Sequence, residues 1–250
     1  MVRTMLLLAA LPMLGADAHY LDDPFRLYTV FQHEPPAAIL DSIQNEVDAI
    51  MSPFGWTFKW SSIDRDPNVE CIILVVVRFK GECGTEDLKE FAPYPFVLGR
   101  TEVSGQGIEP FVDIYCDAIR AHLAGDLRGW NPEKRRAAFG RAVGRVVAHE
   151  LYHVLAKTQH HATKGLGKAT YTPRELLSDN FRFEKNEVWE LRSQALRTLE
   201  QWKRAAAIER AQRELPSLST RSGVDESGET GIDAGGNGGS LYNSTTAIAK

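Results

Sequence analysis

One segment of the 250-residue chain, Pro132–Ala156, restricts the fold more than any other, because it reads as a single long helix. Asn131 is a suitable N-cap, Pro132 fits the first helical position, and Glu133 complements the positive end of a helix dipole. Apolar side chains recur on one face, which we expect to face the core: Phe139, Ala142 and Val146. Four basic residues are expected on the remaining surface of this helix: Lys134, Arg135, Arg141 and Arg145.

The same helix carries His149-Glu150-Leu151-Tyr152-His153, which fits the H-E-x-x-H pattern. Residues four apart lie on one face of a helix, so His149 and His153 can present two imidazole nitrogens to one metal ion. Zn²⁺ suits this arrangement, because imidazole is a borderline ligand and three protein ligands leave one position open for water. Glu150 is then the general base that acts on the metal-activated water, as in zinc peptidases. The alternative is that both are core histidines whose ring nitrogens are satisfied by hydrogen bonds.

Four of the seven histidines fall between His149 and His161, and Gly165-Leu166-Gly167 follows them. With the helix motif, this segment resembles the zinc-binding stretch of metzincin peptidases. It resembles more closely a set of secreted bacterial metzincin-like proteins with H-E-L-x-H, a short loop, a third histidine and G-L-M. The resemblance implies that His161 is the third ligand and that Gly165-Leu166 forms the turn after it. Ala156 and Gly167 stand where the family has a glycine and the methionine of the Met-turn.

Two other residues are alternatives for the third ligand. The segment Glu175-Leu-Leu-Ser-Asp179 resembles the E-x-x-x-D pattern of gluzincins, which implies Glu175 as a ligand. Thr172-Pro-Arg-Glu175 also fits a capping box, which accounts for the glutamate without a metal. His160 is the second alternative, and is otherwise a solvated loop residue. Glycine accepts positive φ, so Gly165 and Gly167 allow the loop to turn back under the site and bring His161 to the metal.

The rest of the chain predicts alternating strands and helices. Strands are expected at residues 25–32, 56–60, 71–79, 96–103 and 109–115, and helices at residues 36–51, 118–124 and 184–213. The run at 71–79 is continuously apolar, which is typical of a central strand covered on both faces. Gly125 is expected to end the short helix. The apolar stripe of the last helix is expected to pack on the core: Val188, Leu191, Ala195, Leu199 and Trp202.

The predicted fold class is α+β. The metzincin resemblance implies a mixed sheet, the active-site helix with H-E-x-x-H and a long C-terminal helix. It also implies that residues 109–115 are the edge strand, which pairs with an extended substrate.

Composition separates the two ends of the chain from its middle. Residues 1–18 combine a basic start, an apolar run and an A-x-A site, which predicts a secretory signal peptide. Residues 19–215 are expected to form the metallopeptidase-like domain, and the Gly/Ser-rich residues 216–250 a disordered tail. No later stretch is long enough to span a bilayer, and a net charge of -4 gives no reason to expect nucleic acid. We therefore expect a secreted or periplasmic monomer.

Three cysteines in an exported chain indicate one disulfide and one free thiol. Cys71 and Cys83 flank a predicted strand, so their Cα atoms should lie beyond the roughly 7 Å that a disulfide allows. Cys83 with Cys116, both just past strand ends, is the favoured pair.

These patterns together predict a zinc-dependent endopeptidase that hydrolyses a peptide or protein substrate. His149, His153 and His161 would bind Zn²⁺, and Glu150 would be the catalytic base. The alternatives are a non-catalytic metzincin-like protein with a structural zinc site and a gluzincin-type peptidase that uses Glu175. An intact Glu150 favours catalysis, because a structural site has no use for that carboxylate.

Overall fold

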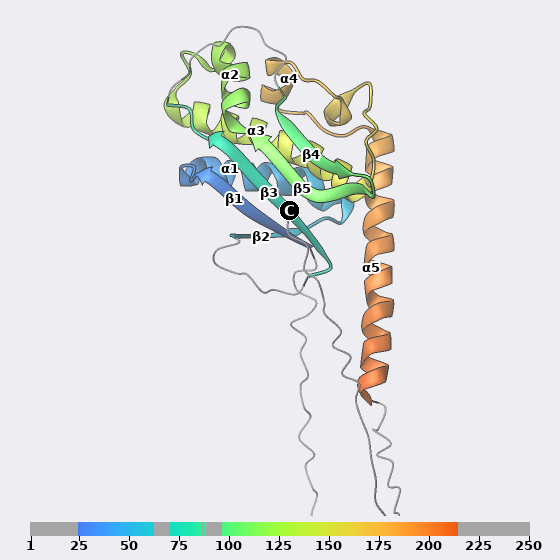
Figure 1. Ribbon diagram of the computed structural model, residues 1–250. Helices are drawn as coiled ribbons and strands as arrows, with labels where there is room; N and C mark the ends of the chain where they lie inside the picture. Colours follow the sequence, from blue (N-terminus) through green and yellow to red (C-terminus); the bar gives the residue numbers. More distant parts are fainter. Residues whose placement is uncertain (1–24, 63–70, 87, 89–96, 215–250) are drawn as a thin grey trace, which may run out of the picture. The chain divides into compact units, whose positions relative to one another are not determined.

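The structure, a computed structural model, describes residues 25–62, 71–86, 88 and 97–214 (Figure 1). The signal peptide predicted at 1–18 and the tail predicted at 216–250 lie outside these residues. Contacts within the chain divide it into residues 1–209 and 210–250. The strands and helices belong to the first unit, apart from the last residues of the long C-terminal helix.

Five strands form one mixed sheet in the order β2-β1-β3-β5-β4, and this sheet with its helices confirms the predicted α+β class. The strands are β1 (Phe25–His33), β2 (Phe58–Ser62), β3 (Ile73–Glu82), β4 (Gly99–Ser104) and β5 (Gly107–Tyr115). The strands β2, β1, β3 and β5 run parallel, whereas β4 is antiparallel to β5.

The edge of the sheet differs from the expectation. Residues 109–115 were predicted as the edge strand, but β5 pairs with β3 on one side and with β4 on the other. The strand β4 is therefore the edge. Spatial order departs from chain order because a tight hairpin at Ser104 and Gly107 folds β4 outward, with Gly107 at a φ of 124°.

The central strand is covered differently from the prediction. The strand β3 does lie between β1 and β5, as expected. Its side chains Val75, Val77 and Phe79 belong to the buried core, whereas on the opposite face Val76 is buried and Leu74 is 38% exposed. The helices α1 (Ala37–Met51) and α3 (Pro132–Ala156) lie together on one side of the sheet (Figure 1). A continuously apolar run does not reveal that the second face is covered only in part, because its pattern contains no alternation.

The other helices are α2 (Cys116–Leu127), α4 (Pro173–Leu177) and α5 (Lys185–Glu214), with 3₁₀ turns η2 (Ser52–Phe54) and η3 (Gly165–Gly167). Gly125 does not end α2, because Leu127 is fully buried and its packing outweighs the roughly 1 kcal/mol cost of a helical glycine. On α5, Leu191 and Ala195 pack in the core as predicted, and the Trp56 Nε1–H donates to Leu191 O at 3.0 Å. No described helix is long and apolar enough to cross a membrane.

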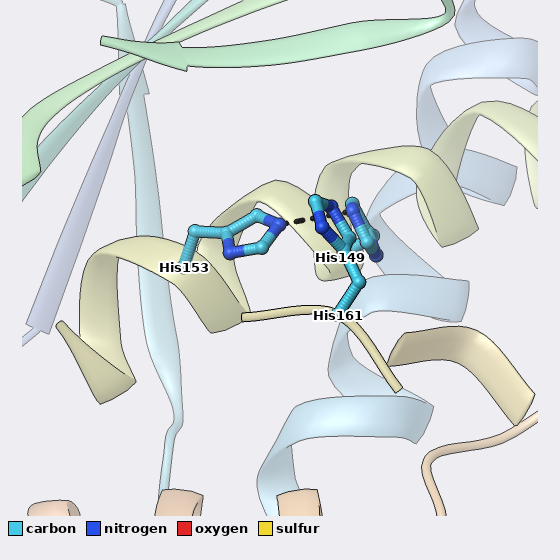
Figure 2. A group of neighbouring side chains, drawn as sticks. All are labelled: His149, His153 and His161. Carbon is cyan, nitrogen blue, oxygen red and sulfur yellow. Dashed lines mark hydrogen bonds between the residues drawn. The ribbon is translucent and has the colours of Figure 1, made fainter. Parts of the chain in front are cut away.

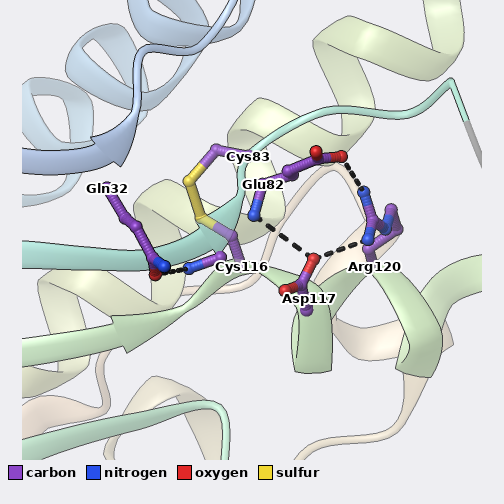
Figure 3. Close-up of a disulfide and its surroundings, with 7 residues drawn as sticks. Gln32, Glu82, Cys83, Cys116, Asp117 and Arg120 are labelled. Atoms are coloured by element: carbon purple, nitrogen blue, oxygen red, sulfur yellow. Dashed lines mark hydrogen bonds and ion pairs between the residues drawn. A yellow bond between two sulfur atoms is a disulfide. The ribbon is translucent and has the colours of Figure 1, made fainter.

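A disulfide joins the end of β3 to the start of α2, which confirms the predicted pair Cys83–Cys116 (Figure 3). Their Cα atoms are 4.9 Å apart. Next to the bond, the Asp117 carboxylate accepts from Arg120 at 2.5 Å and from the Glu82 backbone N–H at 3.3 Å. The cross-link therefore anchors α2 to the sheet, while Cys71 is a free thiol.

Candidate metal centre

The helix α3 has the start and the close packing that its sequence predicts. The Asn131 side chain accepts from the Glu133 backbone N–H at 2.9 Å, so the predicted N-cap is confirmed. Two glycines let α3 approach α1 closely: a Cβ on Gly140 would lie 2.5 Å from Ser42 Cβ, and one on Gly144 would lie 2.8 Å from the carbonyl oxygen of Ile43. The glycine face of α3 therefore packs on α1, which leaves the opposite face, with His149 and His153, toward the loop that follows the helix.

Three histidines come together at the C-terminal end of α3 (Figure 2). His149, His153 and His161 each offer a ring nitrogen, and these nitrogens all lie within 4.8 Å of one another. The His161 ring centroid is 5.3 Å from that of His149 and 4.7 Å from that of His153. His149 and His153 are buried, whereas His161 is exposed. The group could therefore hold one metal ion with one side open.

Two backbone carbonyls determine which ring nitrogens carry protons. Leu166 O lies 2.8 Å from His149 Nδ1, and Thr158 O lies 2.7 Å from His153 Nδ1. A carbonyl oxygen only accepts, so each Nδ1 carries the proton and each Nε2 keeps a lone pair. The two Nε2 atoms are 3.1 Å apart, yet neither neutral ring then has a proton to donate to the other. A cation that accepts both lone pairs satisfies the two rings together.

A proton bound by one of the imidazole rings cannot serve as that cation near pH 7. Burial, with a smaller contribution from the neighbouring His153, lowers the pKa of His149 to about 3. Burial also lowers the pKa of His153 and that of His161. All three imidazoles are therefore neutral at neutral pH, which is the form that binds a metal.

The loop after α3 turns back on itself and carries His161 to the helix. Lys157 ends the helix in the left-handed region with a φ of 52°, and Gly165 has a φ of 65°. The Ala162 N–H donates to Gly167 O at 2.8 Å, and the Leu166 N–H donates to Arg182 O at 2.9 Å. The turn thus uses the positive φ predicted for Gly165, whereas Gly167 does not adopt one, and it also places Leu166 O against His149.

The two alternative ligands lie elsewhere. His160 is exposed, and its backbone N–H donates to Thr158 Oγ1 at 3.1 Å. Glu175 closes the predicted capping box with Thr172 and accepts from Lys168 Nζ at 2.5 Å. The hydrogen bond from Lys168 is the largest of the interactions that lower the pKa of Glu175. Neither residue belongs to the group of converging histidine nitrogens.

Glu150 is a buried carboxylate beside this group. His149, Glu150 and His153 fall within a sector of about 100° of the helix surface. Thr101 Oγ1, on the edge strand β4, donates to Glu150 Oε2 at 2.7 Å, and a Cβ on Gly99 would lie 2.7 Å from Oε1. Burial raises the pKa of Glu150 to about 7, against the opposing effect of the Thr101 hydrogen bond. The carboxylate is therefore poised to gain or lose a proton near neutral pH.

One turn earlier on α3, Arg145 departs from its predicted surface position. Its side chain is fully buried, and its Nε donates to Glu46 Oε1 at 2.7 Å. Its Nη1 donates to Leu176 O at 2.8 Å, and Arg182 Nη1 reaches the same Glu46 oxygen at 2.9 Å. Arg145 is buried because it connects α3 to α1 and α4, and its sequence context does not reveal Glu46 as its partner.

Three residues of the site carry no sequence signal: Gly99, Thr101 and Tyr171. Thr101 and Gly99 look like ordinary strand residues, and only the placement of β4 over α3 brings them to Glu150. Tyr171 lies in a loop, 2.6 Å from His149 Nδ1 through its hydroxyl oxygen. The carbonyls of Thr158 and Leu166 are also invisible in sequence, because every residue has one. No protein-family model and no curated protein matches this sequence.

Proposed function

We propose that the protein is a zinc-dependent peptidase whose metal is held by His149, His153 and His161. The observation that carries the proposal is a buried, proton-accepting Glu150 next to neutral imidazoles whose Nε2 lone pairs converge. Three imidazole ligands with one open side are typical of catalytic zinc, which keeps a fourth position for water or substrate. The metzincin resemblance of the same residues supports this choice.

Zinc bound there would polarise the peptide carbonyl and activate the attacking water. Glu150 would accept the proton of that water and return it to the leaving amine nitrogen. Burial raises the pKa of Glu150 in the metal-free protein, and bound zinc would oppose that rise, so the carboxylate would be ionised and able to accept the proton. Thr101 would donate its hydrogen bond to Glu150 Oε2, so that proton transfer would use the other carboxylate oxygen.

The substrate would be an extended peptide that lies along β4. An edge strand offers unpaired backbone groups, and a peptide can add to it as a further strand. The edge strand here is β4, and its Thr101 contacts Glu150. A peptide bound along β4 would therefore pass close to the proposed base.

The disulfide supports a secreted or periplasmic location, because such bonds persist in oxidising compartments.

The experiment compares Glu150→Gln with the unsubstituted protein and with Glu133→Gln, an exposed change on the same helix. We expect one zinc per chain in all three proteins, and casein hydrolysis lower by at least about 100-fold in Glu150→Gln alone. Zinc content would be measured by atomic absorption, and hydrolysis with and without chelator. Loss of zinc from Glu150→Gln would overturn the assignment of Glu150 as a base. A zinc-loaded protein that cleaves neither casein nor a peptide library would instead have a structural site.

A further inference from the structure

Tyr171 contacts the Nδ1 side of the His149 ring, whereas Nε2 of the same ring faces His153 Nε2. Its hydroxyl oxygen is 2.6 Å from His149 Nδ1 and 2.5 Å from Leu166 O. His149 Nδ1 is itself 2.8 Å from the same carbonyl. The phenol, the imidazole and the carbonyl therefore form a closed triangle of hydrogen-bond distances.

The donors in this triangle follow from what each group can do. The Tyr171 hydroxyl has one proton and donates it to Leu166 O, which only accepts. The Tyr171 oxygen then presents a lone pair, and the His149 Nδ1–H is shared between that oxygen and Leu166 O. This arrangement keeps the proton on Nδ1 and leaves Nε2 free for a metal. Groups that hold a histidine ligand in this way increase its basicity and fix its orientation.

The position of Tyr171 is set by the scaffold around it. Its ring packs nearly perpendicular to the rings of His149 and Phe181, with centroid distances of 5.6 Å and 5.5 Å. Its backbone carbonyl oxygen is 3.0 Å from His122 Nε2, on α2. Both the ring and the backbone of Tyr171 are therefore held by neighbouring residues. The position of the hydroxyl does not depend on a bound metal.

The two helix histidines differ in this respect. The His153 Nδ1–H donates to Thr158 O at 2.7 Å, whereas the His149 Nδ1–H has both a carbonyl and a phenol oxygen. Among the described residues, the first ligand of the motif therefore has an additional side chain at its Nδ1, and the second does not. That side chain comes from outside the motif, 22 residues further along the chain.

We propose that Tyr171 is a positioning residue of the metal centre, which holds His149 in the orientation and tautomer that bind zinc through Nε2. The proposal rests on the metal-binding half of the proposed function and does not depend on peptide hydrolysis.

The test is the zinc affinity of Tyr171→Phe, measured by competition with a chromophoric chelator at pH 7.5. Tyr152→Phe is the matched control, because it removes a phenol of the motif that donates instead to Glu190 at 2.6 Å. We expect Tyr171→Phe to bind zinc about 10- to 100-fold more weakly, the range for lost groups behind a metal ligand. Tyr152→Phe should bind zinc within about 2-fold of the unsubstituted protein. Cobalt-loaded samples of all three proteins should share one visible absorption spectrum, since the three histidine ligands are unchanged.

Two outcomes would overturn the proposal. Equal zinc affinity in Tyr171→Phe and the unsubstituted protein would show that the phenol does not support His149. A phenolate-to-metal absorption band that disappears in Tyr171→Phe would make Tyr171 a ligand and not a positioning residue.

Circular dichroism at the titration temperature shows whether the variant is folded. If it is unfolded, NMR of the unsubstituted protein decides: a slowly exchanging Tyr171 hydroxyl proton with a cross-peak to the His149 Nδ1–H agrees with the proposal, and the lack of that cross-peak or an Nε2–H tautomer of His149 contradicts it. Failure of the unsubstituted, zinc-loaded protein to cleave peptides would count against the peptidase function alone.

Discussion

Two buried polar clusters lie one turn apart on α3, and they differ in the charge of the groups that meet in them. Around Arg145, a positive guanidinium meets the negative Glu46 at 2.7 Å and a backbone carbonyl at 2.8 Å, although its Nη2 has no hydrogen-bond partner among the described residues. Around His149, neutral nitrogens with lone pairs face one another at 3.1 Å. The first cluster joins α1, α3 and α4 through opposite charges. The second has only acceptors at its centre, so it could accept a cation.

Burial and a shifted pKa do not by themselves distinguish a ligand-binding site from a structural cluster. Both groups are buried, and burial shifts the pKa of Arg145 and that of His149 downwards. Burial and a shifted pKa are therefore shared by the two clusters. The difference is the sign of the partners: opposite charges meet in one cluster, whereas lone pairs face one another in the other, which could therefore accept a cation.

The largest effect expected is the stabilisation by zinc. At about 1,000 times its dissociation constant, zinc should raise the free energy of unfolding by about 4 kcal/mol, because only the folded chain brings the three ligands together. His161→Ala should lose most of this gain, since one ligand is gone. Urea unfolding with and without zinc measures both values.

Two variants sharpen that measurement. His160→Ala should keep the full zinc stabilisation, because His160 lies outside the converging group. Glu175→Ala should also keep it, while it lowers the free energy of unfolding by about 1 kcal/mol through the lost capping box. If Glu175→Ala abolished the zinc effect and His161→Ala did not, the gluzincin-type alternative would be correct.

Arg145→Ala should give the next largest change, about 3 kcal/mol of lost stability with or without zinc, because it removes one side of a buried ion pair. The loss should fall at the low end for such pairs, since Arg182 still reaches Glu46. Lys134→Ala, an exposed change on the same helix, is the control and should stay within about 0.5 kcal/mol. A loss in Arg145→Ala that disappears on adding zinc would mean that the two clusters are not independent.

The last effect concerns Glu150 in the metal-free protein. Its pKa is raised from 4.5 to about 7 by burial, so the Glu150 carboxyl binds more protons in the folded state than in the unfolded state between these pH values. The contribution of Glu150 to stability therefore falls as pH rises through this window. Glu150→Gln lacks the penalty and should be more stable than the unsubstituted protein by about 3 kcal/mol at pH 8. The difference should vanish near pH 4, and thermal unfolding across pH in the presence of chelator would show it. A constant difference across this range would contradict the raised pKa.

The local elements could be predicted from sequence because neighbouring residues determine them. The helix α3 follows from the Asn131 cap, Pro132 and the apolar spacing, and the capping box follows from Thr172 and Glu175. The Cys83–Cys116 bond follows from the length of a strand, which excludes the nearer pairing. The helical pair His149 and His153 needs only a spacing of four residues.

Tertiary structure alone decided everything that joins distant segments. Chain order does not reveal that β5 inserts beside β3 and leaves β4 at the edge, since strand pairing depends on contacts far apart in sequence. The burial of Arg145 depends on Glu46, 99 residues away. The environment of Glu150 depends on Thr101 and Gly99 in β4, and that of His149 on Tyr171 and a backbone carbonyl. The spacing along one helix identifies the nitrogens and the carboxylate, but the burial that raises the pKa of Glu150 and the carbonyl that faces His149 Nδ1 are supplied only by the fold.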